Sequence, residues 1–89
     1  MKRRSTPIPY KLVKIEWEDS ARPISEWQWL AEYEIPQTVI CVSVGFLISE
    51  TKDALALAPN LGDLGREQVQ ASGIMRIPLS AIRSRSVLS

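Results

Sequence analysis

The side chains with the clearest capacity for chemistry are two closely spaced tryptophans, Trp27 and Trp29. On an extended segment, side chains two residues apart point to the same side, so both indole rings would lie together. Paired rings of this kind stack on nucleotide bases or wrap a partner. The simpler alternative is that they cap one end of the folded domain. Four other residues are candidate partners of a ligand held there: Asp19, Ser43, Arg66 and Arg76.

The residue types that carry most enzyme chemistry are missing or isolated. The chain has no histidine, which removes the commonest general base and metal ligand. Its one cysteine, Cys41, lies in an apolar segment without a basic neighbour and is expected to be a buried, inert thiol. The carboxylates of Glu16, Glu18 and Asp19 are better explained as solvated charges than as ligands of a hard cation. We therefore expect no enzyme activity, no metal and no cofactor.

Charge is distributed unevenly, although the net charge is only +1. Basic residues gather near the N-terminus, and residues 16–34 carry six acids against one arginine. Residues 1–9, which include Pro7 and Pro9, are expected to form a flexible basic arm. Three of its cations offer an alternative contact for nucleic acid phosphates: Lys2, Arg3 and Arg4. The acidic segment that follows works against tight nucleic acid binding over part of the surface.

With 89 residues, the chain has room for one domain, which we place at residues 10–89. A domain of this size has a thin core and often gains stability by pairing its sheet edges with copies of itself, so we expect a homo-oligomer. The longest apolar run, Val39 to Ile48, is far shorter than the roughly 20 residues of a membrane helix. A single cysteine allows no internal disulfide. These features favour a soluble cytoplasmic protein.

Alternation of apolar and polar residues predicts the first strands. From Tyr10 the pattern places Val13, Ile15 and Trp17 on one face. A second strand follows Val39, and its bulkier residues are expected to face the core: Ile40, Val42, Val44, Phe46 and Ile48. A glycine within it, Gly45, predicts a sharp bend or a close backbone approach. The third strand is expected to place Leu55 and Leu57 opposite an alanine face.

The segments around these strands are read from their turn residues. Residues 19–36 form either a short helical turn that begins near Ser25 or, slightly favoured, a long loop folded over the end of the domain. Residues 59–72 are expected to be a polar loop, in which Gly62-Asp63-Leu64-Gly65 is a turn and not a phosphate clamp. A fourth strand at 74–77, one helical turn at 80–82 and a short closing strand at 83–88 complete the pattern.

Several short motifs resemble a group of small phage and prophage proteins of uncharacterised function. They are Trp17-Glu18-Asp19-Ser20, Ser43-Val44-Gly45-Phe46-Leu47-Ile48, Leu55-Ala56-Leu57-Ala58-Pro59 and Ile77-Pro78-Leu79-Ser80-Ala81-Ile82. The resemblance covers residues 10–83. The order of the expected strands is also similar to that of Sm-like proteins, although the histidine-containing turn by which bacterial Sm-like RNA chaperones hold uridines is absent. The expected fold is therefore mainly β: a small five-stranded SH3-like (Sm-like) barrel with a long loop or short helix between strands 1 and 2.

The phage resemblance implies a non-enzymatic oligomer, such as a ring, in the cytoplasm of an infected bacterium. Small phage proteins of this kind include inhibitors of host defence that sequester nucleotide immune signals between subunits. The leading hypothesis is such a binding module. Two alternatives stay open: a single-stranded RNA or DNA binder that uses the basic arm, and a structural or adaptor subunit that binds only protein.

Overall fold

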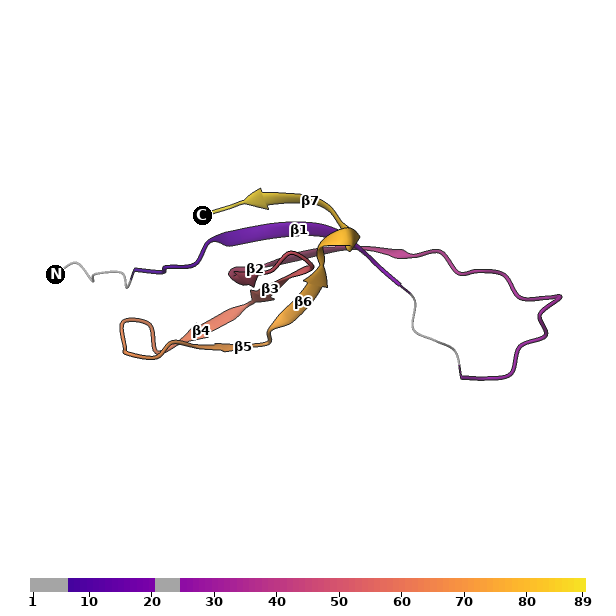
Figure 1. Ribbon diagram of the computed structural model, residues 1–89, viewed down its shortest axis with the longest axis horizontal. Helices are drawn as coiled ribbons and strands as arrows, with labels where there is room; N and C mark the ends of the chain where they lie inside the picture. Colours follow the sequence, from indigo (N-terminus) through magenta and orange to yellow (C-terminus); the bar gives the residue numbers. More distant parts are fainter. Residues whose placement is uncertain (1–6, 21–24) are drawn as a thin grey trace.

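The computed structural model describes residues 7–20 and 25–89, and it is built almost entirely of β-strands (Figure 1). In chain order the elements are β1 (Leu12–Asp19), β2 (Val39–Glu50), β3 (Ala54–Ala58), β4 (Asn60–Gly62), β5 (Gln70–Ser72), β6 (Met75–Pro78), the 3-10 helix η1 (Leu79–Ala81) and β7 (Ile82–Val87). The strands expected from alternation are confirmed. Lys2, Arg3 and Arg4, which were named as an alternative contact for nucleic acid, lie outside the described residues.

Five strands form one antiparallel sheet in the order β6-β3-β2-β1-β7, and β4 pairs with β5 as a separate hairpin. Consecutive strands in this sheet are neighbours, apart from β7, which crosses over to lie beside β1. The crossover is made by η1, where Pro78 precedes a single helical turn and Ile82 resumes the extended backbone. Strands β6 and β7 share no pairing, so the hydrogen-bonded sheet remains open.

The core is small and lies between the faces that the bent sheet turns toward each other. Its buried cluster consists of Val13, Ile15, Leu55, Leu57 and Ile77, with Trp17, Leu47, Leu79 and Ile82 packed against it. Burial of each such aliphatic side chain contributes about 1.5–3 kcal/mol relative to an exposed position. The inward faces expected for β1 and β3 are confirmed.

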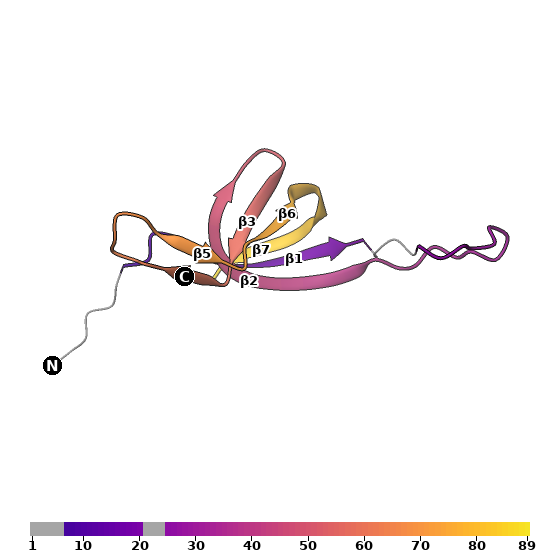
Figure 2. The same ribbon diagram turned by 90° about the horizontal axis from the view of Figure 1, so that it is seen from below.

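Strand β2 is the longest strand and bends strongly, so that β3 and β6 rise over β1 and the first part of β2 (Figure 2). Its pairing with β3 contains a register shift between Leu47 and Ser49, which accompanies the bend. A Cβ added at Gly45 would lie 3.1 Å from the Ala58 carbonyl oxygen. The backbone of β3 therefore approaches β2 closely at Gly45, as predicted from the glycine.

The prediction of which face of β2 points inward is wrong. Gly45 is buried and Cys41 and Ser43 are half-buried, whereas Val42 and Val44 are 62% and 51% exposed. The physical reason is the close crossing of β3 at Gly45, which leaves room for small side chains on the inner face and turns the bulky ones outward. Cys41 was expected to be a buried thiol and is only half-buried.

The polar segment 59–72 is also more regular than predicted, because it contains the β4–β5 hairpin. The predicted turn at Gly62–Gly65 is present at the tip of this hairpin. Asp63 and Gly65 have φ values of 56° and 81°, and the Arg66 N–H donates to the Asp63 carbonyl oxygen at 3.1 Å. The left-handed conformation is accessible to glycine and to the short polar side chain of aspartate.

The molecule is elongated. Its radius of gyration is 18.1 Å, against about 12 Å for a compact chain of this length. Figure 1 shows the cause: residues 25–38, before β2, project from one end of the sheet, and the β4–β5 hairpin projects from the other. Much of the chain thus lies away from the core.

Candidate functional site

The segment between β1 and β2 carries the two candidate tryptophans. We call residues 25–38 the tryptophan loop. It contains no helix. Two overlapping turns are closed by the Glu32 N–H, which donates to the Trp29 carbonyl oxygen at 3.0 Å, and by the Tyr33 N–H, which donates to the Leu30 carbonyl oxygen at 3.4 Å. The loop interpretation of this segment is therefore confirmed for residues 25–38, and the helical alternative is wrong there.

The tryptophans do not cap the domain. Trp27 is 103% exposed and Trp29 is 82% exposed, and the loop points away from the sheet (Figure 2). A long loop folded over the end of the domain, as predicted, would have covered these rings. Three further apolar side chains of the same loop are uncovered: Leu30, Tyr33 and Ile35. The loop thus exposes five large apolar side chains.

The prediction that the two rings lie together is consistent with a shared cavity. Trp27, Gln28 and Trp29 line a cavity of about 310 Å³. Gln28 was not singled out from the sequence, although its position between the two tryptophans was the available signal. Two exposed aromatic rings beside one cavity can stack on a flat ring.

The charge of the tryptophan loop opposes a phosphate. The loop contains Glu26, Glu32 and Glu34 and no lysine or arginine. The predicted cations lie elsewhere: Arg76 is in β6, and Arg66 follows the β4–β5 turn, 3.9 Å from an Asp63 carboxylate oxygen. A phosphorylated ligand bound by the tryptophans would need cations from outside the loop.

Ser43 is placed on the inner side of β2 and belongs to a second, separate cavity. The Trp17 indole Nε1–H donates to the Ser43 hydroxyl at 3.0 Å, and that hydroxyl donates to the Met75 sulfur at 3.7 Å. The cavity has a volume of about 220 Å³ and is lined by Ser43, Val44, Leu57, Pro59, Gly73 and Met75. Because Arg76 follows Met75, Ser43 and Arg76 lie in the same part of the molecule.

The remaining predicted residue, Asp19, ends β1 and pairs with Val39 at the base of the tryptophan loop. The predicted ligand residues therefore lie in four places in one chain. The two tryptophans are in the loop, Asp19 is at its base, Ser43 and Arg76 are at the sheet, and Arg66 is on the β4–β5 hairpin.

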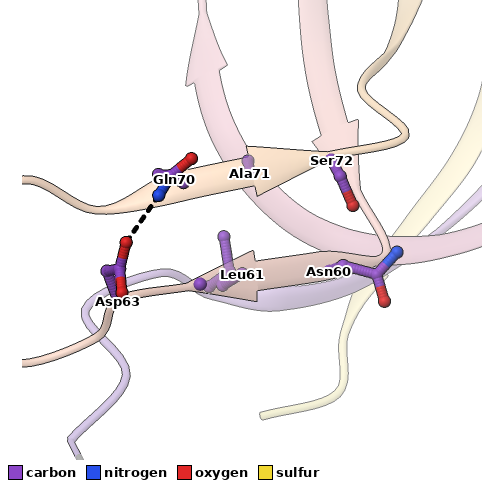
Figure 3. A pocket seen from close by; sticks show the side chains of 7 residues that line it. Asn60, Leu61, Asp63, Gln70, Ala71 and Ser72 are labelled. Atoms are coloured by element: carbon purple, nitrogen blue, oxygen red, sulfur yellow. Dashed lines mark hydrogen bonds between the residues drawn. The ribbon is translucent and has the colours of Figure 1, made fainter.

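The β4–β5 hairpin forms a third cavity, of about 350 Å³, that sequence patterns did not indicate. Figure 3 shows the side chains of Asp63 and Gln70 facing each other across the two strands, joined by a hydrogen bond from the Gln70 amide to the Asp63 carboxylate. Asn60 and Ser72 add polar groups at the other end of the hairpin. Asp63 and Gln70 are each other's partners, and all four polar side chains are exposed, so the cavity is a shallow feature of the hairpin.

Two of the three carboxylates considered as cation ligands have other partners. Glu18 lies 3.3 Å from an Arg83 guanidinium nitrogen, and Glu16 accepts a hydrogen bond from the Ser84 hydroxyl at 3.5 Å. In the described parts of the chain, no three acidic, cysteine or histidine side chains come together as a metal site would need. Residues 7–20 and 25–89 also contain no helix with the length and apolar character needed to cross a bilayer.

One ion pair stands out by its geometry. Arg85 of β7 holds the carboxylate of Glu50 with two hydrogen bonds, at 2.9 and 3.2 Å. This hydrogen-bonded guanidinium lowers the pKa of Glu50 from its ordinary value, and the carboxylate raises the pKa of Arg85. The pair ties the end of β2 to the edge strand β7.

No protein-family model matches the chain, and no curated protein or solved structure is significantly similar to it.

Proposed function

We propose that the protein is a non-enzymatic, homo-oligomeric binding module that holds a flat ring, in particular a nucleotide base, at its paired tryptophans. The observation that carries this proposal is the exposure of Trp27 and Trp29, which flank Gln28 around one cavity. Aromatic stacking on a base contributes about 1–3 kcal/mol in single-stranded nucleic acid complexes. The cavity volume of about 310 Å³ lies at the lower end of the range for small-molecule sites.

The oligomer is part of the proposal because one chain supplies only part of the site. The tryptophan loop is acidic, so the phosphates of a nucleotide would be neutralised by arginines from outside it. Arg66 and Arg76 of a second copy are the candidates. The strand order β6-β3-β2-β1-β7, with η1 before β7, supports describing the sheet as an open SH3-like barrel. The resemblance to phage proteins supports a role in sequestering a nucleotide signal in the cytoplasm of an infected bacterium.

The test is a panel of nucleotides added to the full chain: AMP, ADP-ribose and cyclic dinucleotides. In a Trp17→Phe background, fluorescence comes only from Trp27 and Trp29, and stacking of a base is expected to quench it. Trp27→Leu and Trp29→Leu should each abolish the quenching, while Val69→Leu, at a distant exposed site, should not. A panel that leaves both the fluorescence and the melting temperature unchanged would contradict nucleotide binding.

A protein-only structural or adaptor subunit is the second candidate, favoured by the exposed Leu30 and Ile35 of the same loop. Contiguous exposed apolar surface of this kind marks protein interaction sites. The two candidates separate in the same experiment, since an adaptor ignores the nucleotide panel but loses its partner when Leu30 and Ile35 are replaced by serine.

A further inference from the structure

The first half of β2 has a free edge. Strand β1 accompanies β2 from Val39 to Phe46 without a register shift, but β3 joins the other side only from Phe46 onward. The Leu47 N–H donates to the Lys11 carbonyl oxygen of the β1 side at 2.8 Å. Backbone groups alternate in direction along an antiparallel strand, so odd-numbered residues here point to β1 and even-numbered ones point away. The N–H and C=O groups of Ile40, Val42 and Val44 are therefore directed at the free edge.

This edge is apolar and uncharged. Ile40, Val42 and Val44 are 45%, 62% and 51% exposed, and residues 39–44 contain no charge and no proline. Within the described chain, their outward backbone groups pair with no other strand. An apolar, unprotected edge is a template for another strand. Native proteins normally blunt such an edge or cover it, and nothing in these six residues blunts it.

One end of the edge is more crowded than the other. Val44 lines the same cavity as Pro59, Gly73 and Met75, which lie beside it. The open part of the edge is therefore the stretch from Ile40 to Val42. Ile40 and Val42 both direct their backbone groups at the open edge there, and Cys41 lies midway between them.

We propose that this edge is covered by the same edge of a second copy, running antiparallel about a two-fold axis at Cys41. In that register Ile40 of each copy forms a hydrogen-bonded pair with Val42 of the other, and the two Cys41 residues lie opposite each other. An isologous contact needs a self-complementary surface, and an uncharged strand meets this condition because it places no like charges opposite each other. The inference rests on the self-association proposed above and names the surface responsible for it.

The antiparallel arrangement also places each tryptophan loop against the body of the other copy. Beyond the axis, each chain continues from Thr38 into its own loop along the body of the other copy. Leu30 and Ile35, which are 88% and 86% exposed in one chain, would then run beside the second copy. The same arrangement brings the tryptophans of one copy toward the half of the other that carries Arg76.

Cysteine cross-linking tests the register directly, because Cys41 is the only cysteine. In a non-hydrogen-bonded antiparallel pair the two Cα atoms are about 4.5 Å apart, within the range that a disulfide spans. Oxidation of the full chain with copper phenanthroline is expected to give a covalent dimer. The matched control is Ser43→Cys in a Cys41→Ser background: in the proposed register its two thiols are four residues apart along the strands, about 14 Å, and should not join.

A second variant tests the same edge without oxidation. Val42→Lys places a charge at the centre of the contact and is expected to weaken self-association about ten-fold or more, as measured by native mass spectrometry and sedimentation. Val42→Thr keeps the branched shape without the charge and should still associate. Circular dichroism on both variants checks that the fold is retained.

The outcomes separate the two proposals. Multimers that fail to cross-link at Cys41, or that cross-link as readily at position 43, would overturn this edge contact and leave self-association standing. Single chains at every concentration would overturn both. A dimer that cross-links at Cys41 and is disrupted by Val42→Lys supports both the edge contact and self-association.

Discussion

The two halves of β2 have similar apolar sequences and opposite surroundings. The second half, from Phe46 to Glu50, pairs with β3 and packs Leu47 against the core. The first half, from Val39 to Val44, pairs only with β1 among the described residues and leaves its valines exposed. The difference teaches that a strand is buried by what lies over it and on both of its edges, and not by its apolar content alone.

The largest expected effect that tests this comparison comes from the core beside the second half. Leu55 pairs with Glu50 and is 1% exposed. Leu55→Ala is expected to lower the free energy of unfolding by about 2–5 kcal/mol, because it leaves a cavity among fully buried neighbours. Urea unfolding measures the loss. Val42→Ala in the first half should change the stability of dilute chains by no more than about 0.5 kcal/mol. Equal losses for the two variants would break the comparison.

The next effect lies at the boundary between the halves. Gly45→Val places its side chain against the Ala58 carbonyl oxygen and the Leu57 Cβ, which are 3.1 and 3.3 Å from an ideal Cβ. Overpacking of this kind costs about 1–3 kcal/mol, and thermal unfolding should show a lower melting temperature. Val44→Ile adds bulk one residue earlier, on the exposed face, and serves as the control. A stable Gly45→Val variant would mean that β3 does not pin β2 at this point.

A smaller effect concerns the hydrogen bond that attaches the first half to the core. Trp17→Phe removes the indole N–H that donates to Ser43. We expect a loss of about 0.5–1.5 kcal/mol from this bond, with some further cost from the smaller ring. Chemical denaturation measures the loss. If Ser43→Ala in the Trp17→Phe background costs as much as it does alone, the two residues are not coupled and the first half of β2 is not attached to the core in this way.

The smallest expected effect is a pH dependence at the far end of the second half. Arg85 lowers the pKa of Glu50, so the pair stabilises the fold above the ordinary carboxyl pKa of 4.5. That contribution should disappear as the pH falls from about 5 through the lowered pKa of the folded state. Glu50→Gln is expected to be less stable than the native chain at pH 6 and equally stable at strongly acid pH, as measured by urea unfolding. A constant difference at all pH values would contradict the ion pair.

Local patterns were sufficient to predict the mainly β class and the strand positions, but the hydrogen-bonded sheet is open and not the closed barrel that was expected. Alternation in β1 and β3 identified Val13, Ile15, Leu55 and Leu57 as inward residues, and the turn before β7 was evident from its proline. The facing of β2 could not be read in the same way, because both of its faces are apolar. The deciding signal was Gly45: a residue without a side chain belongs on the face that another strand crosses closely.

The sequence was sufficient to predict that the two tryptophans lie together, but not where in the molecule they lie. The spacing of Trp27 and Trp29 indicated neighbouring rings, and both line one cavity. Their exposure was not evident, because sequence patterns assume that large aromatic residues find cover within their own chain. The residues predicted to share a ligand with them were chosen by chemical type, and nothing local in the sequence specifies that β6 and the tryptophan loop lie apart.

The position of the tryptophan loop has a practical consequence. Proteolytic cleavage within residues 25–38 would divide the chain into a short piece that carries β1 and a long piece that carries every other strand. Because β1 pairs with β2 on one side and with β7 on the other, the two pieces should remain associated after the cut. The Leu88 N–H also donates to the Leu12 carbonyl oxygen at 2.7 Å, so the C-terminus lies beside the start of β1. Joining the original ends through a linker and opening the chain in the loop would give a circular permutant in which β1 becomes the last strand.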